Sequence, residues 1–418
     1  MTPMPAAWDT SKSMRSRAST LCALMLLAAP THAGSIDWNG YVDFRAVAPA
    51  QQQDWTDGGL GKTRFGGGGS AASTQGALAA SFQLAPEWLA SGTLQYLPQQ
   101  RHPLDVLDAS IRYRPVSTTA WRWSLRMGAF FPSISLENGN TGWTSPWTLT
   151  PSAINTWVGE ELRAVGTEVR IEHRADTHTL ALVGSLFGKN DPAGELLATR
   201  GWGMGDLTSG LGASLREPDA IAPLVGTSPP VRYRPFVEID HRIGWYAGVD
   251  WDAPAYGRLS VMRYDNRANP TREQDYAGRE VYAWHTRFWS VGMQSQVGDV
   301  LLVAQGMHGA TAFEPAPGLL LDTQFNAGYL LAAWGQGAWQ PAIRLDLFQT
   351  RQLPDWLPDP LSEHGNAATI ALNWRPRQHV RVTGELLRVD STRNQRRLDG
   401  ESSHQVDTQV QVNLRLQY

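Results

Sequence analysis

Apolar and polar side chains alternate at every second position in many stretches of this chain, and this two-residue period limits the fold more than any other feature. In residues 36–46 apolar or small side chains hold the even positions, while acidic, amide or basic side chains hold most of the others. Residues 121–131 and 409–418 show the same alternation. A period of two is typical of a β-strand with one apolar face and one wet face.

Similar segments recur along the chain, and together they predict about 16 strands, each near the 9 to 11 residues that a tilted membrane strand needs. The centres of the less regular ones lie near residues 80, 93, 110, 168, 183, 247, 260, 286, 303, 329, 345, 371 and 384. The expected number is even, as a bacterial single-chain barrel requires. The sequence therefore predicts an all-β fold for residues 34–418, a transmembrane antiparallel β-barrel.

The connections between these strands are expected to alternate between short and long. Short turns are expected at residues 86–87, 115–120, 175–177, 254–255, 298–299, 335–337 and 376–378. Long loops are expected at residues 49–75, 132–160, 189–235, 266–279, 309–323, 351–366 and 391–406, with a shorter one at 98–103. Outer-membrane barrels have this pattern, with long outer loops and short periplasmic turns. Closing the sheet also removes the unpaired N–H and C=O groups that an edge would expose to hydrocarbon.

Other classes of protein fit the sequence poorly. After residue 34 no stretch approaches the run of about 18 apolar residues that a membrane-spanning helix needs. A β-propeller would repeat every 40 to 50 residues or so, and we find no such period. The formal net charge of −3 provides no basic field that would attract nucleic acid.

Residues 1–33 are predicted to be a signal peptide for export. Basic residues precede an apolar run at residues 21–29, and Ala33 offers a small side chain at the expected cleavage position. The apolar run is too short to cross a bilayer as a helix. The chain's one cysteine, Cys22, lies inside this signal, so the exported part is expected to contain no disulfide. With a barrel after the signal, the expected location is the cell outer membrane.

Aromatic side chains flank the expected short turns, where amphipathic rings meet the lipid headgroups of a membrane. They are Trp88, Tyr113, Trp121, Trp251, Tyr256, Trp334, Trp339 and Trp374. The core of a soluble β-sandwich would not place them beside the turns so regularly. The chain itself ends on an alternating strand with Leu414, Leu416 and Tyr418. This ending looks like the assembly signal of outer-membrane proteins, so the barrel-assembly machinery is an expected partner.

One region resembles a known family. Residues 126–137 read Arg-Met-Gly-Ala-Phe-Phe-Pro-Ser-Ile-Ser-Leu-Glu, and the motifs Trp-Val-Gly-Glu-Glu and Gly-Thr-Glu-Val follow at residues 157–161 and 166–169. This layout is similar to the phosphate-selective porin family of O and P type. The resemblance implies a third long loop, here residues 132–160, which folds into the barrel and constricts the pore. It also implies a homotrimer.

The predicted constriction departs from that family in its charge. Between Pro132 and Trp157 there is no Arg or Lys, whereas a pore that captures anions depends on clustered cationic side chains. The loop offers Glu137 together with asparagines, threonines and tryptophans. A polar and aromatic constriction suits sugars and other neutral solutes equally well, so the solute stays open.

Strand parity predicts which charged side chains face the lumen. The candidates for lining the pore are Arg45, Arg112, Arg122, Arg126, Glu137, Glu168, Arg170, Arg344, Asp346, Arg381 and Arg415. Charges that face a confined lumen form ion pairs along the wall or set a transverse field that orients hydrated solutes. A mild preference for anions is a hypothesis from this set.

We therefore expect a passive diffusion channel for small hydrophilic solutes, with outer-membrane lipid and lipopolysaccharide around it. No cofactor, metal site or catalytic residue is implied, because neither a Gly-x-Ser-x-Gly elbow nor a His-Glu-x-x-His helix is present. Two alternatives are a lipid-modifying barrel enzyme and a plugged or export-type barrel whose mouth is closed by residues 189–235. A hairpin hidden in that segment would raise the number of strands to about 18.

Overall fold

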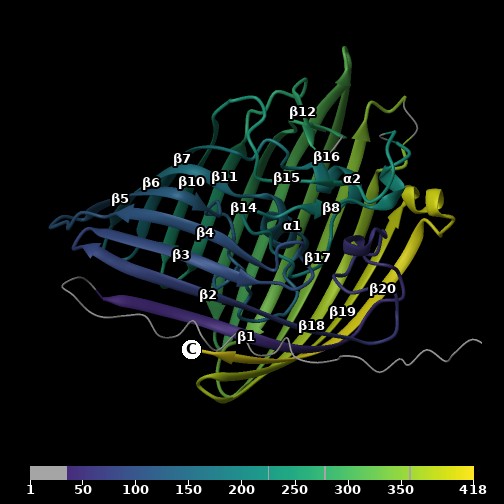
Figure 1. Cartoon of the computed structure of the whole chain (residues 1–418). Coiled ribbons are helices and arrows are strands. Elements are labelled where there is room, and N and C mark those ends of the chain that lie inside the picture. Colours follow the sequence, from purple (N-terminus) through teal and green to yellow (C-terminus); the bar gives the residue numbers. More distant parts are fainter. Residues whose placement is uncertain (1–34, 225, 277–278, 357–358) are drawn as a thin grey trace, which may run out of the picture.

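A computed structural model describes residues 35–224, 226–276, 279–356 and 359–418. The predicted signal peptide and Cys22 lie outside the described residues. The described chain forms one closed antiparallel barrel of 16 strands (Figure 1). Its strands are β1 (Ile36–Ala48), β2 (Ala71–Ala85), β3 (Trp88–Tyr96), β4 (Leu104–Tyr113), β5 (Trp121–Phe130), β6 (Ala164–Arg174), β7 (Thr179–Gly188), β10 (Gly244–Ala253), β11 (Gly257–Asp265), β14 (His285–Val297), β15 (Val300–Ala316), β16 (Leu319–Trp334), β17 (Trp339–Leu353), β18 (Glu363–Arg377), β19 (Val380–Arg393) and β20 (His404–Gln417).

The first and last strands close the sheet. β1 pairs with β20 from Tyr41 opposite Gln417 to Ala48 opposite Val410, so each strand of the barrel has two neighbours. The predicted barrel and its 16 strands are confirmed. The 18-strand alternative is wrong, because the hairpin within the long connection, β8 (Leu215–Arg216) with β9 (Arg232–Tyr233), stands outside the barrel sheet.

Side chains on the strands alternate between the two faces of the wall. On β20, Val410, Val412, Leu414 and Leu416 are exposed on the outer face, whereas the four residues that alternate with them are buried inside. Exposed apolar side chains continue around the barrel on the other strands. This is the apolar belt of a lipid-facing wall, and among the described residues no helix is long and apolar enough to span a membrane.

Aromatic rings gather beside the short turns, as the sequence predicts. Trp339 and Trp374 stack with their ring centroids 5.5 Å apart, and the rings of Trp88 and Tyr113 lie 4.8 Å apart. Tyr256 is 74% exposed beside its turn. These rings lie at one end of the barrel, which we name the turn end; the opposite end, with the long connections, is the loop end.

The wall is uneven in height. The barrel strands from β3 to β11, which leave out the β8–β9 hairpin, have 9 to 11 residues, whereas β14 to β20 have 13 to 17 (Figure 1). The long loop expected at residues 309–323 is wrong for this reason, since β15 continues to Ala316 and β16 begins at Leu319. Only residues 317–318 turn the chain, with Gly318 at a φ of +79° that favours glycine.

The remaining elements belong to the long connections. They comprise the helices α1 (Ala153–Glu161) and α2 (Glu195–Arg200), the hairpin of β12 (Glu273–Tyr276) and β13 (Arg279–Tyr282), and the short 3-10 helices η1 (Trp55–Asp57), η2 (Asp219–Ile221) and η3 (Asn394–Asp399). Both α-helices are buried along their whole length. Such burial in a loop of a barrel means that the helices lie in the lumen.

Candidate functional site: the lumen and its three inserts

Three of the long connections enter the barrel and pack against its inner wall. We name them the first insert (residues 49–70), the second insert (residues 131–163) and the third insert (residues 189–243). The second insert contains the loop that the sequence places inside the barrel. It crosses the lumen from β5 and β6 to the opposite wall, where β17, β18 and β19 receive it.

Arg344 of β17 holds the second insert most firmly. Its guanidinium forms ion pairs of 2.8 Å with both Glu137 of the insert and Asp346 of its own strand. It also donates hydrogen bonds to the carbonyl oxygens of Thr150, at 2.6 Å, and Pro151, at 3.0 Å. All three charged side chains are fully buried. Three of the predicted pore-lining residues therefore meet in one network, although Glu137 and Arg344 lie 207 residues apart in the sequence.

Neighbouring strands extend this contact toward the closing seam. The Glu385 carboxylate on β19 accepts a hydrogen bond of 3.1 Å from the backbone N–H of Thr150. Arg381 donates to the carbonyl oxygen of Pro146 at 3.0 Å. Arg415 pairs with Asp43 at 2.7 Å, which links β20 to β1. The predicted residues Arg381 and Arg415 thus lie inside the barrel and contact the insert or the seam instead of open lumen.

The second and third inserts are joined through two glutamates at the end of α1. Glu160 forms an ion pair of 2.8 Å with Arg200 of α2. The Glu161 carboxylate accepts hydrogen bonds from the hydroxyl of Tyr233, at 2.6 Å, and from the backbone N–H of Leu196, at 3.0 Å. Burial raises the pKa of Glu161 to about 7, because the charged form loses its hydration there.

The first insert is tied to both the wall and the third insert. Lys62 forms a buried ion pair of 2.7 Å with Glu363 of β18, and burial lowers the pKa of Lys62 to about 7. Asp206 of the third insert pairs with Arg45 of β1 at 2.8 Å and with Arg64 of the first insert at 2.7 Å. Those two arginines hold the pKa of Asp206 well below its usual range. Arg45 is the only predicted pore-lining residue in this group.

Part of the inner wall is apolar, which the sequence analysis did not foresee. Inward side chains of β14 to β17, including Phe288, Met307 and Phe325, pack against Trp157 of α1 and Trp202 of the third insert. The signal was present in the second half of β16, residues 327–334, where inward and outward positions are apolar or small alike. Such a strand contacts protein on its inner face and lipid on its outer face. The helices of the inserts pack against the inner face as they would in the hydrophobic core of a soluble protein.

The predicted residues at the turn end face a wetter part of the lumen. Arg126 of β5 pairs with Glu168 of β6 at 2.8 Å, and Arg170 pairs with Asp250 of β10 at 2.7 Å. Arg112 lies directly opposite Arg126 in the register of β4 and β5. Arg112 and Arg122 are both exposed.

Neither Arg112 nor Arg122 forms an ion pair with any residue that the structure describes. Two cations without an acidic partner, on adjacent strands, give this side of the lumen an excess of positive charge. We name this side the arginine patch.

The charged residues that the sequence analysis missed lie in the inserts or at strand ends. They are Lys62, Arg163, Arg200, Asp206, Glu363 and Arg393. Arg163 donates hydrogen bonds to the carbonyl oxygens of Leu107, at 3.1 Å, and Ser209, at 2.7 Å, and so joins β4 to the third insert. A two-residue period exists only within strands, so it gives no signal for the residues of the inserts. Glu363 and Arg393 are the first and last residues of their strands, where the alternation begins or stops.

The last residue of the chain lies against the first strand. Tyr418 stacks on Trp38 with ring centroids 4.2 Å apart, and its backbone exchanges hydrogen bonds of 3.0 and 3.1 Å with Gly40. Leu414 and Leu416 face outward in the apolar belt. The residues of the expected assembly signal are therefore placed at the seam that closes the barrel.

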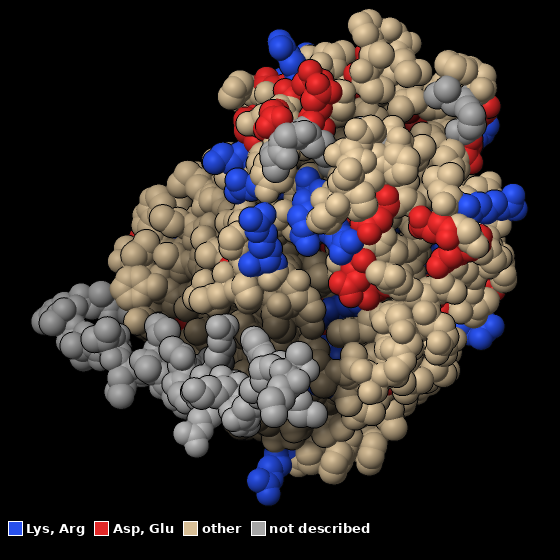
Figure 2. Space-filling view, turned by 45° about the vertical axis from the view of Figure 1, so that its right-hand side comes forward, with Lys and Arg blue, Asp and Glu red and all other residues tan. Residues whose placement is uncertain are grey.

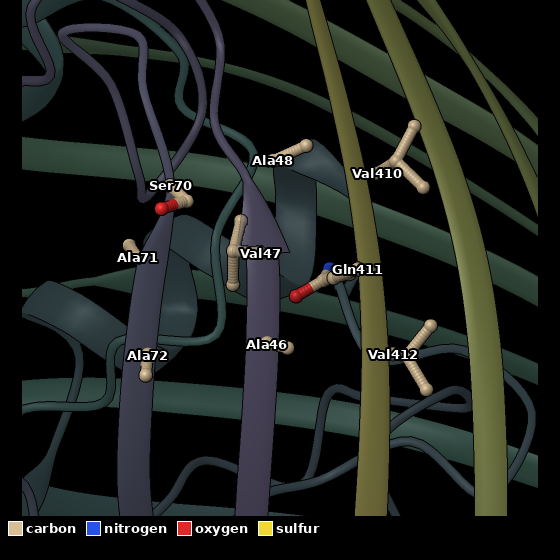
Figure 3. A pocket seen from close by; sticks show the side chains of 9 residues that line it. All are labelled: Ala46, Val47, Ala48, Ser70, Ala71, Ala72, Val410, Gln411 and Val412. Carbon is tan, nitrogen blue, oxygen red and sulfur yellow. The ribbon is translucent and has the colours of Figure 1, made fainter.

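Two other features of the structure resemble binding sites. Figure 3 shows a recess of about 540 Å³ at the seam, lined by small or apolar side chains such as Ala46, Ala72 and Val412 and by no titratable group. It offers packing surface rather than a solute site. In the third insert, Asp191, Glu238 and Asp240 each place a carboxylate oxygen within 4.8 Å of the others. Backbone N–H groups of the same loop donate to these carboxylates and account for the arrangement.

The fold was compared with known proteins. No protein family and no curated protein matches the sequence. Among solved structures, the outer membrane channel DcaP of Acinetobacter baumannii is similar with a TM-score of 0.56 and 12% identity, covering 92% of this chain and 98% of its own. A loop L8 deletion mutant of OmpT, an outer membrane protein of Vibrio cholerae, is similar with a TM-score of 0.52 and 10% identity over 93% and 100%. OmpF of Salmonella typhi, in a complex with daunomycin, has a TM-score of 0.52 and 11% identity over 92% and 98%.

At these identities the likeness concerns the fold. The closed barrel, its outward apolar belt and these similar structures define the class: the chain is a 16-stranded β-barrel of the cell outer membrane. Three inserts fold into the lumen of this barrel.

Proposed function

We propose that this protein is a narrow, porin-like channel through which small hydrophilic solutes diffuse passively across the outer membrane, with a mild preference for anions. The arginine patch is the observation that carries the proposal. Arg112 and Arg122 face the turn end of the lumen, and in the described structure neither has an acidic partner. Fixed positive charge inside a low-dielectric wall raises the local concentration of anions.

The loop end of the barrel also carries cationic side chains that can attract anions. Figure 2 shows Lys and Arg side chains gathered near the middle of the visible face, with Asp and Glu side chains above and beside them. A hollow of about 540 Å³ in the loops is lined by Arg101, His102 and Arg234, with Asp105 as its one acidic lining residue. Cations at both ends of a path favour entry of anions from either side.

The inserts make the path narrow. Inward side chains near the loop end, such as Asp43, Gln75 and Gln411, are buried beneath them. The second insert has no Arg or Lys between positions 132 and 157. We therefore propose that the channel selects small solutes by size and weak charge rather than by specific capture of phosphate. The likeness to DcaP, an outer membrane channel, supports the channel proposal.

Reversal potentials in planar bilayers under a salt gradient test the preference for anions. The wild-type protein should show a potential of the sign that anion flux gives, and Arg112→Gln with Arg122→Gln should move it toward zero. Arg351→Gln is the matched control, because Arg351 is an exposed arginine on the outer face of β17. A cation-selective wild-type channel would refute the proposal.

A plugged barrel is the second candidate, and the buried lumen at the loop end favours it. Phe130 and Ala164 are cross-strand partners, so residues 131–163 can be replaced by a short Asn-Gly turn that leaves β5 and β6 intact. A narrow channel should show small current steps that become several-fold larger in this variant. If the wild-type protein passes no current while the shortened variant does, the plugged barrel is correct.

We also propose a homotrimer, as the resemblance to the O and P type porins implies. A structure of OmpT from Vibrio cholerae with the same fold is described as a trimer form. Native mass spectrometry in detergent tests this assembly, and a monomer at all concentrations would reject it.

A further inference from the structure

A recess interrupts the outer face of the tall wall where the apolar belt ends. It has a volume of about 690 Å³ and is lined by residues of β14 to β18. Gly306 of β15 and Gly328 of β16 lie directly opposite each other and form part of its floor. Val291 and Leu347 stand on either side, 53% and 69% exposed. Glycine in the middle of a strand costs stability and often marks a place where a ligand approaches the backbone closely.

Polar side chains begin immediately on the loop-end side of this recess. One row of outward residues follows the cross-strand register around the wall: Arg263, Trp289, His308, Asn326, Gln349 and His364. The row below it is Val291, Gly306, Gly328 and Leu347, and it reaches a polar side chain only at Asn366 of β18. The boundary between water and hydrocarbon therefore crosses the recess, with its floor in the apolar zone and its upper rim in the polar zone.

Two arginines lie at this upper rim. The guanidinium carbon of Arg263 lies 5.5 Å from the centre of the Trp289 ring, and Trp289 lines the recess. Arg287 is two residues before Trp289 on the same face of β14, about 7 Å along the strand.

Acidic groups are also present beside these arginines. Asp265 lies directly opposite Arg287 in the register of β11 and β14, but its ion pair is with His285 at 3.0 Å, and the His285 ring in turn contacts the Arg287 guanidinium at 3.3 Å. Asp322 lies two strands across from His285 and forms no ion pair with Arg287 in the described structure. Among the described residues, neither Arg263 nor Arg287 has a carboxylate within ion-pairing distance.

We propose that this recess binds lipopolysaccharide of the outer leaflet. One acyl chain lies on the Gly306 and Gly328 floor between Val291 and Leu347, and a phosphate group of the sugar headgroup contacts Arg263 and Arg287. The complementarity carries the assignment, since an apolar slot below two arginines that form no ion pair in the described structure matches a lipid with an anionic headgroup. The proposal depends on the location in the outer membrane and not on conduction.

The test compares two kinds of variant with controls on the same face. Gly306→Leu fills the floor, and a Cβ at this position would meet no atom within 4 Å, so the strand tolerates the change. Arg263→Gln with Arg287→Gln removes the cations. The controls are Gly384→Leu on β19, where a Cβ also meets no atom within 4 Å, and Arg388→Gln on the same strand.

Protein refolded in detergent is titrated with purified lipopolysaccharide and with its dephosphorylated form, and bound lipid is measured by native mass spectrometry. Filling the floor or removing both arginines should weaken binding about tenfold or more, whereas the controls stay within about twofold of wild type. Dephosphorylation should weaken wild-type binding to the level of the arginine variant.

Equal binding by Gly306→Leu and Gly384→Leu, or no preference for the phosphorylated lipid, would overturn the site and leave only non-specific annular lipid. A heat-dependent gel shift shows that each variant is folded. Single-channel conductance of the same variants should equal that of wild type, so failure of the lipid site is distinguishable from failure of the channel.

Discussion

Replacing Arg344 with Met should release the second insert from the barrel wall. The wild-type guanidinium forms two ion pairs of 2.8 Å, with Glu137 and Asp346, and is fully buried. Met keeps most of the apolar stem but leaves both carboxylates buried without their cation. Removing one partner of a buried ion pair costs about 3 to 5 kcal/mol. Because each 1.4 kcal/mol is about a tenfold change in an equilibrium constant, the ratio of docked to released insert should fall a hundredfold to several-thousandfold.

Hydrogen exchange of the α1 amides measures this ratio. The backbone N–H of Thr156 donates to Ser152 and that of Leu162 donates to Val158, so their protection reports whether the helix is docked and formed. In the variant, α1 should lose protection while amides of β18 and β20 keep theirs.

A second variant distinguishes the effect of the unpaired buried carboxylates from the effect of replacing the arginine side chain itself. Glu137→Gln and Asp346→Asn added to Arg344→Met remove the uncompensated charges, and protection should recover in part. The view of Arg344 as the anchor of the second insert is wrong if Arg344→Met leaves the α1 amides as protected as in wild type. It is also wrong if the variant lowers the protection of amides equally throughout the barrel.

The remaining predictions concern pH and closure of the barrel. Burial raises the pKa of Glu161 to about 7 from its ordinary 4.5. The protonated form therefore stabilises docking of α1 on α2, and this contribution is fully present below pH 4.5. It is on the order of 3 kcal/mol and is lost as the pH rises through about 7. The opening free energy of α2, measured by hydrogen exchange, should fall over this range in wild type and stay level in Glu161→Gln; a parallel fall in both would contradict the assignment. Tyr418→Ala removes the stack on Trp38, worth about 0.5 to 1.5 kcal/mol, and should lower the fraction of heat-shifting folded protein in the outer membrane. Tyr256→Ala, at an exposed turn, is its control, and equal yields would end the proposed assembly role.

The strands of the barrel were predictable because their signal is local. Alternation needs only the residues of one segment, as in β20, and the lengths of neighbouring connections then give the closed order. The loop expected at residues 309–323 was wrong although the range contains Gly309, Pro315 and Pro317, residues typical of loops, because β15 continues past the first two of them. Local signals thus determine the number of strands better than their ends.

The contents of the lumen were predictable only in part. Parity gives the inward direction of Arg344, but its partner Glu137 lies 207 residues away in a connection without periodicity. The apolar inner face of β16 was also missed, because a run that is apolar on both faces is ambiguous without knowledge of what covers it. The pore-lining role of the predicted residues remains a prediction that the bilayer measurements address.

The partners of the second insert have a consequence for the order of assembly. Thr150 docks on Glu385, 235 residues later in the chain, and Trp147 docks on Asn373, 226 residues later. Contacts so distant in sequence form slowly and late. The segment precedes the strands that receive it by more than 200 residues, so it cannot dock until β18 and β19 have joined the wall. Completing the interior of this barrel therefore depends on first forming the part of the wall that lies opposite the segment.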